Sequence, residues 1–436
     1  MSGEPRLSMF AALESRPFRW VWGAALSGDS GRFGVILVAG WEAFRLGHGS
    51  ALWPSLVSFL LLVPSTLFGL LAGGVADRVN RARQAASGQL VNALACGAAV
   101  LLTAAGHLDL LAVLVVAAVV GVGNSVQGPA WQALVPRLVG PERLLNASLM
   151  VRIAQQGAEM TGPAVGTLAL AVSGPAAAFA VCAGLYAAGT LMFWRVGRVV
   201  PERPPARPVR GVWSPVAEGL RYVRAQAPLG TLLAWVGLHC SLTMASIGIL
   251  PVVAVANLGG GAGIYGLLLT AFGLGSVLGP LGMMWLGRRV DPVTQLVVAG
   301  VLSGAPLVSL GLVPNVAVDI TSAALAGAAQ AVFMAGIYSL TQGVAADAMR
   351  GRVASIQLSL TTGAMGLTSL GWGALAAVMA PGVVLALPGL GFVLACVPFA
   401  RRRQRIRAAV RTRPGGRRPP AAAAVALGAD EAAGRL

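Results

Sequence analysis

Charged side chains interrupt an apolar run near the start of this sequence. Asp29 and Arg32 lie three residues apart within residues 18–45. In a helix this spacing places both on one face, so Arg32 can neutralise Asp29 or tune its proton affinity. A charge in the middle of a membrane costs about 2.5–3.5 kcal/mol, so such a pair requires a reason. It is either a proton- or cation-binding site or a structural ion pair that lines a wet cavity.

A second polar stripe crosses a later apolar run. Arg152, Gln155, Gln156 and Glu159 recur at helical spacing and share one face. Glu159 lies about two turns from Arg152 and has no other charged residue close to it in the sequence. Glu159 and the two glutamines are therefore candidates for coupling or substrate binding.

Three further polar groups have simpler interpretations. His239 is the only histidine inside a predicted span; it could titrate near neutrality or make a packing hydrogen bond. Glu42 and Arg45 are expected to pair at the outer rim. Asp319 is expected to cap the N-terminus of its helix.

Aromatic residues and cysteines within the apolar runs add no clear site. The cysteines lack metal-ligand spacing, so we expect free buried thiols and no metal or cofactor. They are Cys96, Cys182, Cys240 and Cys396. The aromatic residues could line a cavity, although core packing is the default. They are Trp41, Trp131, Trp235, Phe272, Phe333 and Tyr338.

The composition identifies the solvent that surrounds these side chains. Of the 436 residues, 56% are hydrophobic and only 11% are charged, whereas soluble domains carry about 25% charged residues. Lipid must therefore surround most of the chain. The net charge of +17 sits in gaps between apolar runs, so we expect no nucleic-acid partner.

The uncharged runs predict an all-α membrane protein with twelve transmembrane helices. A span needs about 20 residues, and three longer runs divide at Gly- or Pro-rich breaks near Gly174, residues 259–263 and Pro381. The predicted spans are 18–45, 50–76, 84–106, 109–132, 150–172, 175–196, 228–256, 262–286, 292–312, 316–341, 353–379 and 382–400.

Arginine placement predicts the orientation of these spans. Nearly every Arg lies in alternate loops or at the termini, so both termini should be in the cytoplasm. The Pro- and Arg-rich stretch 197–227 divides the chain into two six-helix bundles related by a pseudo-two-fold axis. The predicted units are a leader (1–17), two bundles (18–196 and 228–400), the cytoplasmic linker 197–227, and a basic, disordered, lipid-attracted tail (401–436).

A short motif after the second span resembles a known family. Residues 73–83 read Gly-Gly-Val-Ala-Asp-Arg-Val-Asn-Arg-Ala-Arg. This resembles the loop signature of the major facilitator superfamily, with Asn80 and Ala82 departing from it. Asn tolerates positive φ, so the turn can survive. The resemblance implies the major facilitator fold.

The motif suggests a cytoplasmic gate. Asp77 is a short acidic side chain at a helix end, and the eleventh span begins after Arg350 and Arg352 on the same side of the membrane. We hypothesise that Asp77 contacts that helix N-terminus and closes the gate between the halves. The gate residues are Gly73, Asp77, Arg78, Arg81, Arg350 and Arg352.

Softer similarities point to the enterobactin-exporter-like branch of this superfamily. They lie at residues 18–20, 27–29, 128–136, 145–147 and 350–353. In the fifth span Gly157, Gly162, Pro163 and Gly166 resemble an element of drug–proton antiporters, with one spacing a residue too long. Ordinary packing glycines remain the alternative. The antiporter Arg of the fourth span is absent, which puts the usual proton relay in doubt.

The resemblance implies proton-coupled export of a small amphipathic compound, such as a drug, siderophore or secondary metabolite. A lipid flippase of the same fold, a non-transporting sensor or scaffold, and an importer remain open. We expect an inner-membrane monomer that binds a small molecule, protons and membrane lipids. No nucleotide-binding loop or nucleophile motif appears, so an enzyme is not expected.

Overall fold

The computed structural model describes residues 11–76, 80–199, 213–286, 290–401 and 404. Helices account for nearly all of these residues, and no strand occurs among them. The first half contains α1 (Arg16–Leu46), α2 (Leu52–Ala76), α3 (Arg81–Ala104), α4 (Leu110–Leu138) and α5 (Leu144–Val199). The second half contains α7 (Ala227–His239), α8 (Leu250–Ala256), α9 (Ala262–Leu286), α10 (Pro292–Leu312), α11 (Val316–Val344), α12 (Arg350–Ala376) and α13 (Pro381–Arg401).

Two of the predicted spans are joined in one long helical element. The 56-residue α5 bends at Gly174, whose φ of 75° is a conformation that favours glycine, and Pro175 follows it. This is the predicted break between the fifth and sixth spans. With α5 counted as two spans, and α7 and α8 counted together as one, the described residues form twelve spans, as the sequence predicted.

The seventh span is not the continuous helix that its uncharged run suggests. After α7, a π-helical turn (Cys240–Met244) and a 3-10 turn (Ala245–Ile249) precede α8. This change of pitch reorients the side chains that follow His239, because π and 3-10 turns have different residue periods. Hydropathy alone could not reveal the break.

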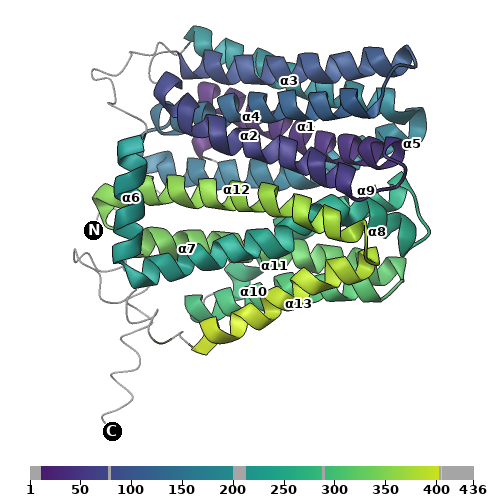
Figure 1. Ribbon diagram of the computed structural model, residues 1–436. Coiled ribbons are helices and arrows are strands. Elements are labelled where there is room, and N and C mark those ends of the chain that lie inside the picture. The colour runs from purple at the N-terminus through teal and green to yellow at the C-terminus, as the bar shows by residue number, and fades with distance from the viewer. Residues whose placement is uncertain (1–10, 77–79, 200–212, 287–289, 402–403, 405–436) are drawn as a thin grey trace.

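The helices form two stacked bundles, with α1–α5 in one and α7–α13 in the other (Figure 1). The helix α6 (Trp213–Ala225) runs across one end of the molecule, within the predicted linker (Figure 1). It attaches to the second bundle, because Tyr222 Oη accepts the Ala346 backbone N–H at 3.0 Å and Glu218 pairs with Arg352.

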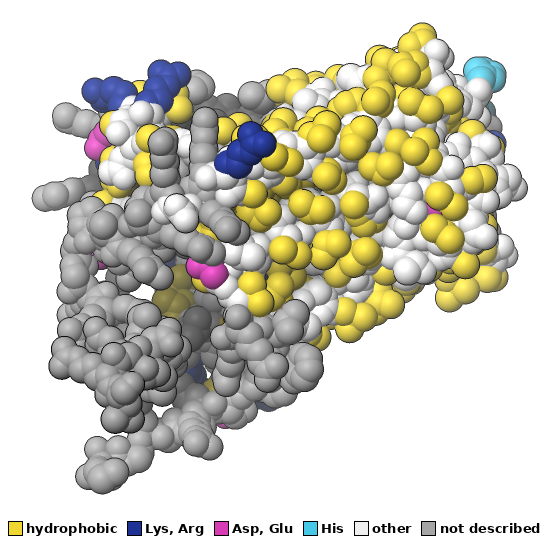
Figure 2. All heavy atoms as spheres, turned by 90° about the horizontal axis from the view of Figure 1, so that it is seen from below, with side chains coloured by type: hydrophobic (Ala, Val, Ile, Leu, Met, Phe, Trp, Pro, Cys, Tyr) yellow, Lys and Arg dark blue, Asp and Glu magenta, His cyan; other side chains and the backbone are white. Residues whose placement is uncertain are grey.

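The outer surface of the molecule is apolar enough to face membrane lipid. Eight stretches of the described chain are long and apolar enough to cross a membrane, and one of them, Asn146–Val199, has the length of two spans. Hydrophobic side chains cover the flank seen in Figure 2, whereas described charges gather mostly at one end. The chain is therefore a multi-pass membrane protein.

Side-chain caps set several helix starts. Asn80 Oδ1 accepts the Arg83 N–H at 3.0 Å and caps α3 with φ −58°. Asn80 therefore does not use the positive φ that it could tolerate, and its side chain serves as a cap instead. Asn315, not Asp319, caps α11 by accepting the N–H groups of Ala317 and Val318. The capping role predicted for Asp319 was also wrong.

Candidate functional site

The two charged residues of α1 lie side by side. Arg32 Nε is 3.6 Å from Asp29 Oδ1, and the exposed fractions of the two side chains are 32% and 14%. The guanidinium of Arg32 also lies over the Phe33 ring, 4.4 Å from its centroid. The predicted pair thus forms, and both side chains stay partly exposed.

Glu159 of α5 extends this charged group. Its carboxylate lies within electrostatic range of Arg32, Asp29 and Arg152, and beside the Ser276 hydroxyl of α9. Two acids from different helices therefore belong to one charged group, in which Arg32 is paired with Asp29. The sequence pointed to each acid separately and gave no indication that they come together.

The other residues of the predicted stripe connect the two bundles. Gln156 Nε2 donates to the Ser276 backbone oxygen at 2.9 Å, which joins α5 to α9. Arg152 donates to Gln155 Oε1 at 3.3 Å and lies over the Tyr338 ring of α11 at 5.7 Å. The stripe faces the second bundle as well as the charged pair.

Glycines allow α5 and α9 to approach closely. A Cβ on Gly273 would overlap the Glu159 backbone oxygen, and a Cβ on Gly266 would overlap the Thr167 side chain. The acid is thus held where the two bundles touch. Sequence reasoning missed Gly273 and Ser276, because neither residue is charged and glycine is common throughout the chain.

A second interface between the bundles joins α2 to α12. Thr66 and Thr362 place their hydroxyl oxygens 2.7 Å apart, and Ser369 Oγ donates to the Ser55 backbone oxygen at 3.3 Å. A Cβ on Gly366 would lie 2.7 Å from Val63 Cγ2. These contacts run from the start of α2 toward its middle. They hold α2 against α12 along the half of α2 that follows the loop 47–51.

The glycine motif of the fifth span packs against α1. A Cβ on Gly162 would overlap the Ser30 backbone oxygen, and one on Gly166 would lie 3.0 Å from Leu37 Cδ2. Gly157 is looser, since its nearest neighbour would be Leu26 Cδ1 at 3.7 Å. Pro163 lies inside the helix, and its carbonyl accepts the Thr167 hydroxyl at 2.7 Å. These contacts support helix packing for this motif.

His239 lies away from the charged group, in the core of the second bundle. Its Nε2 is 3.2 Å from Ser303 Oγ, and its ring stacks on Phe333 with the centroids 4.2 Å apart. Trp235 and Phe392 complete this aromatic cluster. The geometry agrees with the packing interpretation of His239.

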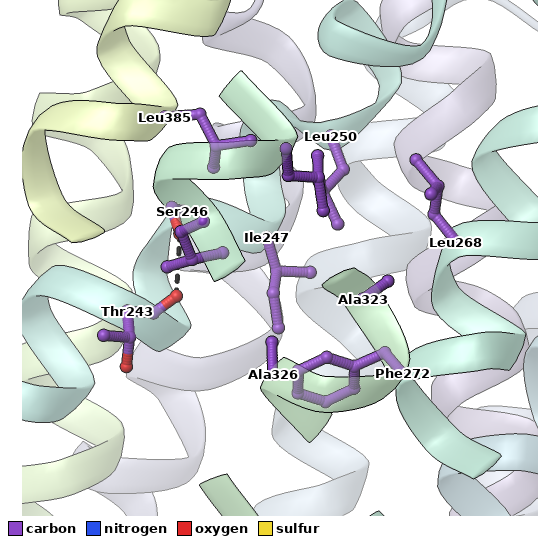
Figure 3. Close-up of a pocket in the computed structure, with 11 residues that line it drawn as sticks. Thr243, Ser246, Ile247, Leu250, Leu268, Phe272, Ala323, Ala326 and Leu385 are labelled. Carbon is purple, nitrogen blue, oxygen red and sulfur yellow. Dashed lines mark hydrogen bonds between the residues drawn. The ribbon is translucent and has the colours of Figure 1, made fainter. Parts of the chain in front are cut away.

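A hollow beside this core is lined almost wholly by apolar side chains (Figure 3). It has about 360 Å³ of space not filled by atoms, and this volume includes some open space beyond the hollow itself. Phe272, Ala323 and Ala326 line it, with Thr243 and Ser246 as its polar members. Of the six aromatic residues noted in the sequence, only Phe272 reaches this hollow.

The predicted gate lies only partly within the described residues. Asp77 and Arg78 are outside them, so their contact with α12 stays a prediction. Gly73 belongs to α2 and Arg81 begins α3.

Two of the arginines of the predicted gate, those at the start of α12, already have acidic partners. Arg350 Nη2 is 2.8 Å from Asp347 Oδ1, and Arg352 pairs with Glu218. Both pairs lie on the surface of the second half.

Two more predictions concerning side chains are confirmed. Glu42 pairs with Arg45 at 2.6 Å at the end of α1. The four cysteines are free and buried.

Comparison with known proteins agrees with this arrangement. Residues 7–431 match the family described as transmembrane secretion effector. The chain belongs to this family. The match confirms its predicted place in the major facilitator superfamily, whose members are transporters. Enterobactin exporter EntS of Citrobacter koseri is 28% identical over 351 residues, which cover 78% of this chain and 81% of the exporter. EntS of Shigella flexneri is also 28% identical over the same coverage.

Solved structures share the fold at much lower identity. A POT family transporter in complex with 5-aminolevulinic acid has a TM-score of 0.73 at 12% identity, covering 92% of this chain and 98% of its own. A bacterial homologue of the iron transporter ferroportin, in an inward-facing state, has a TM-score of 0.67 at 14% identity, covering 89% and 98%. This transporter therefore has the predicted fold of two six-helix bundles.

Proposed function

We propose that this transporter exports a small amphipathic compound in exchange for protons. The observation that carries the proposal is that Glu159 lies within electrostatic range of the Asp29–Arg32 pair, at the face where the bundles meet. Protonation of either carboxylate changes the net charge of this group. Such a change favours one arrangement of the bundles over the other.

The proposed cycle is alternating access by rocking of the two halves. The contacts of α2 with α12 and of α5 with α9 close the side that carries the loops 47–51 and 257–261. The arginine-rich loops lie on the other side, which the positive-inside rule assigns to the cytoplasm. We therefore infer that this conformation is closed to the outside, that both termini are in the cytoplasm, and that the chain lies in the inner membrane.

The surroundings of the charged group suggest the class of cargo. Apart from its few acids, glutamines and hydroxyls, the interface between the bundles is apolar, which suits a lipophilic compound with polar substituents. The curated relatives named as exporters of enterobactin support a siderophore-like cargo and the outward direction. We expect a monomer to suffice, because one chain contains both bundles, and the basic tail to attract anionic lipids.

The experiment is an efflux assay in a pump-deficient host, with a panel of fluorescent drugs, catecholates and lipophilic amines. Expression should lower cellular accumulation of at least one compound several-fold, and a protonophore should abolish the difference. Efflux that survives the protonophore would exclude proton coupling. A panel with no response, at confirmed membrane expression, would contradict export of this cargo class.

A further inference from the structure

Asp319 is an acidic residue that the proposed cycle does not use. It lies in the first turn of α11, with none of its surface exposed to solvent. Neither carboxylate oxygen has a hydrogen-bond partner among the described residues. An ionised carboxylate only accepts hydrogen bonds, and leaving it unpaired in an apolar interior costs several kcal/mol.

The helices around Asp319 provide no fixed positive charge. The described chain packs α7, α9, α10 and α12 against α11, and neither α9 nor α10 contains a charged residue. Their titratable groups are His239 of α7, which contacts Ser303, and Tyr265 of α9, whose hydroxyl lies 3.5 Å from the Ile36 backbone oxygen.

The arginines on the helices packed against α11 are distant from Asp319. Arg350 and Arg352 begin α12 at the opposite end of α11, about 37 Å away along a 25-residue rise. Arg352 is also paired with Glu218. On the described parts of α7, α9, α10 and α12, no side-chain cation therefore neutralises Asp319.

Asp319 lies close to the hollow in the second bundle. Ala323 and Ala326 line the hollow of Figure 3, and Asp319 precedes Ala323 by one helical turn on the same face. Ser322 and Gln330 are further buried polar residues of α11. The acid thus lies about 6 Å along the helix from the hollow, on its outer side.

We propose that Asp319 is a second coupling-cation site, which binds a proton or a sodium ion in the outer half of the second bundle. A bound cation removes the cost of the unpaired carboxylate in the described conformation. Release of that cation to the outside then requires water to reach Asp319. This site is separate from the charged group around Arg32, and it adds a cation-binding acid in the second bundle to those of the first.

The test uses the purified full-length protein and a lipophilic carbodiimide, which modifies protonated carboxyl groups in apolar surroundings. Peptide mass spectrometry should find the label on Asp319, and much less on the exposed Asp347. For a proton site, labelling of Asp319 falls as pH rises and does not change with sodium. For a sodium site, sodium protects Asp319 at constant pH, relative to choline at the same ionic strength.

A second measurement checks the same site in the folded protein. The melting temperature of the wild type should rise with falling pH or with added sodium, and Asp319→Asn should lose most of that rise. Asp347→Asn is the matched control and should keep it. The Asp319-dependent rise should also persist in an Asp29→Asn/Glu159→Gln background, which separates this site from the proposed transport site. An unlabelled Asp319 at every pH and sodium concentration, or an Asp319→Asn protein with the full wild-type response, would overturn the proposal.

Discussion

The backbone carbonyl oxygen of Glu159 lies against Gly273, closer than a side chain at position 273 would allow. This contact brings α5 of the first bundle onto α9 of the second. It also fixes the backbone that carries the Glu159 carboxylate. The proposed coupling acid is thus attached to the surface that must separate when the bundles rock.

Gly273→Ala should therefore weaken the described conformation. We expect the substitution to lower the stability of the described arrangement of the bundles by about 1–3 kcal/mol, because the new methyl group overlaps the Glu159 carbonyl. Transport should slow severalfold, and reagents should reach the outer side of the cleft more often. Gly282→Ala is the matched control on α9, since its Cβ meets no atom within 4 Å. Equal transport by the two variants would contradict a tight α5–α9 contact.

Gly162→Ala should destabilise the first bundle. Its methyl group would overlap the Ser30 backbone oxygen of α1, so we expect a loss of about 1–3 kcal/mol of unfolding free energy. Thermal unfolding in detergent measures the difference. Gly184→Ala on the same helical element has open space at its Cβ and should melt like the wild type. A normal melting temperature for Gly162→Ala would argue against the packing role of the motif.

Thr66 and Thr362 offer a way to lock the cycle. Their hydroxyl oxygens are 2.7 Å apart across the two bundles, so Thr66→Cys with Thr362→Cys should form a disulfide under mild oxidation. The native cysteines are buried and should not interfere. Oxidation should abolish transport and a reductant should restore it, while Thr66→Cys alone responds to neither. Full transport by the cross-linked protein would rule out separation of α2 from α12 during the cycle.

His239 should affect stability and leave coupling unchanged. Its ring packs on Phe333 and contacts Ser303, so His239→Ala should lower the unfolding free energy by about 2–4 kcal/mol. The pH profile of transport per folded molecule should match that of the wild type. His107→Ala, at an exposed position, should alter neither property. A shifted pH profile for His239→Ala would show that this histidine takes part in proton coupling.

The fold could be predicted from the sequence because its signals are local. Charge-free runs of span length, the break at Gly174 and alternating arginines all follow from the cost of exposing charge or backbone to lipid. The irregular turn after His239 escaped prediction, because it leaves the apolar run unbroken. The role of Asp319 was also mistaken: Asn315, one turn earlier, is the cap.

Single residues of the site could be predicted from the sequence, but their arrangement across helices could not. Asp29 and Arg32 are neighbours on one helix, so their pairing follows from spacing. That Glu159 joins them, and that Gln156 reaches Ser276, depends on how α1, α5 and α9 rotate and pack. Those rotations are set by close glycine contacts between distant parts of the chain, which one sequence does not reveal.

The most direct test of the account concerns the two acids of the charged group around Arg32. Everted membrane vesicles with an acidic interior, from which protons flow out, would be supplied from outside with a cargo identified by the efflux panel. Asp29→Asn and Glu159→Gln should each reduce gradient-driven accumulation at least tenfold at equal expression. Glu142→Gln, an exposed acid outside the bundles, serves as the control and should transport normally. Gradient-driven accumulation at the wild-type rate in both acid variants would contradict proton coupling at this site.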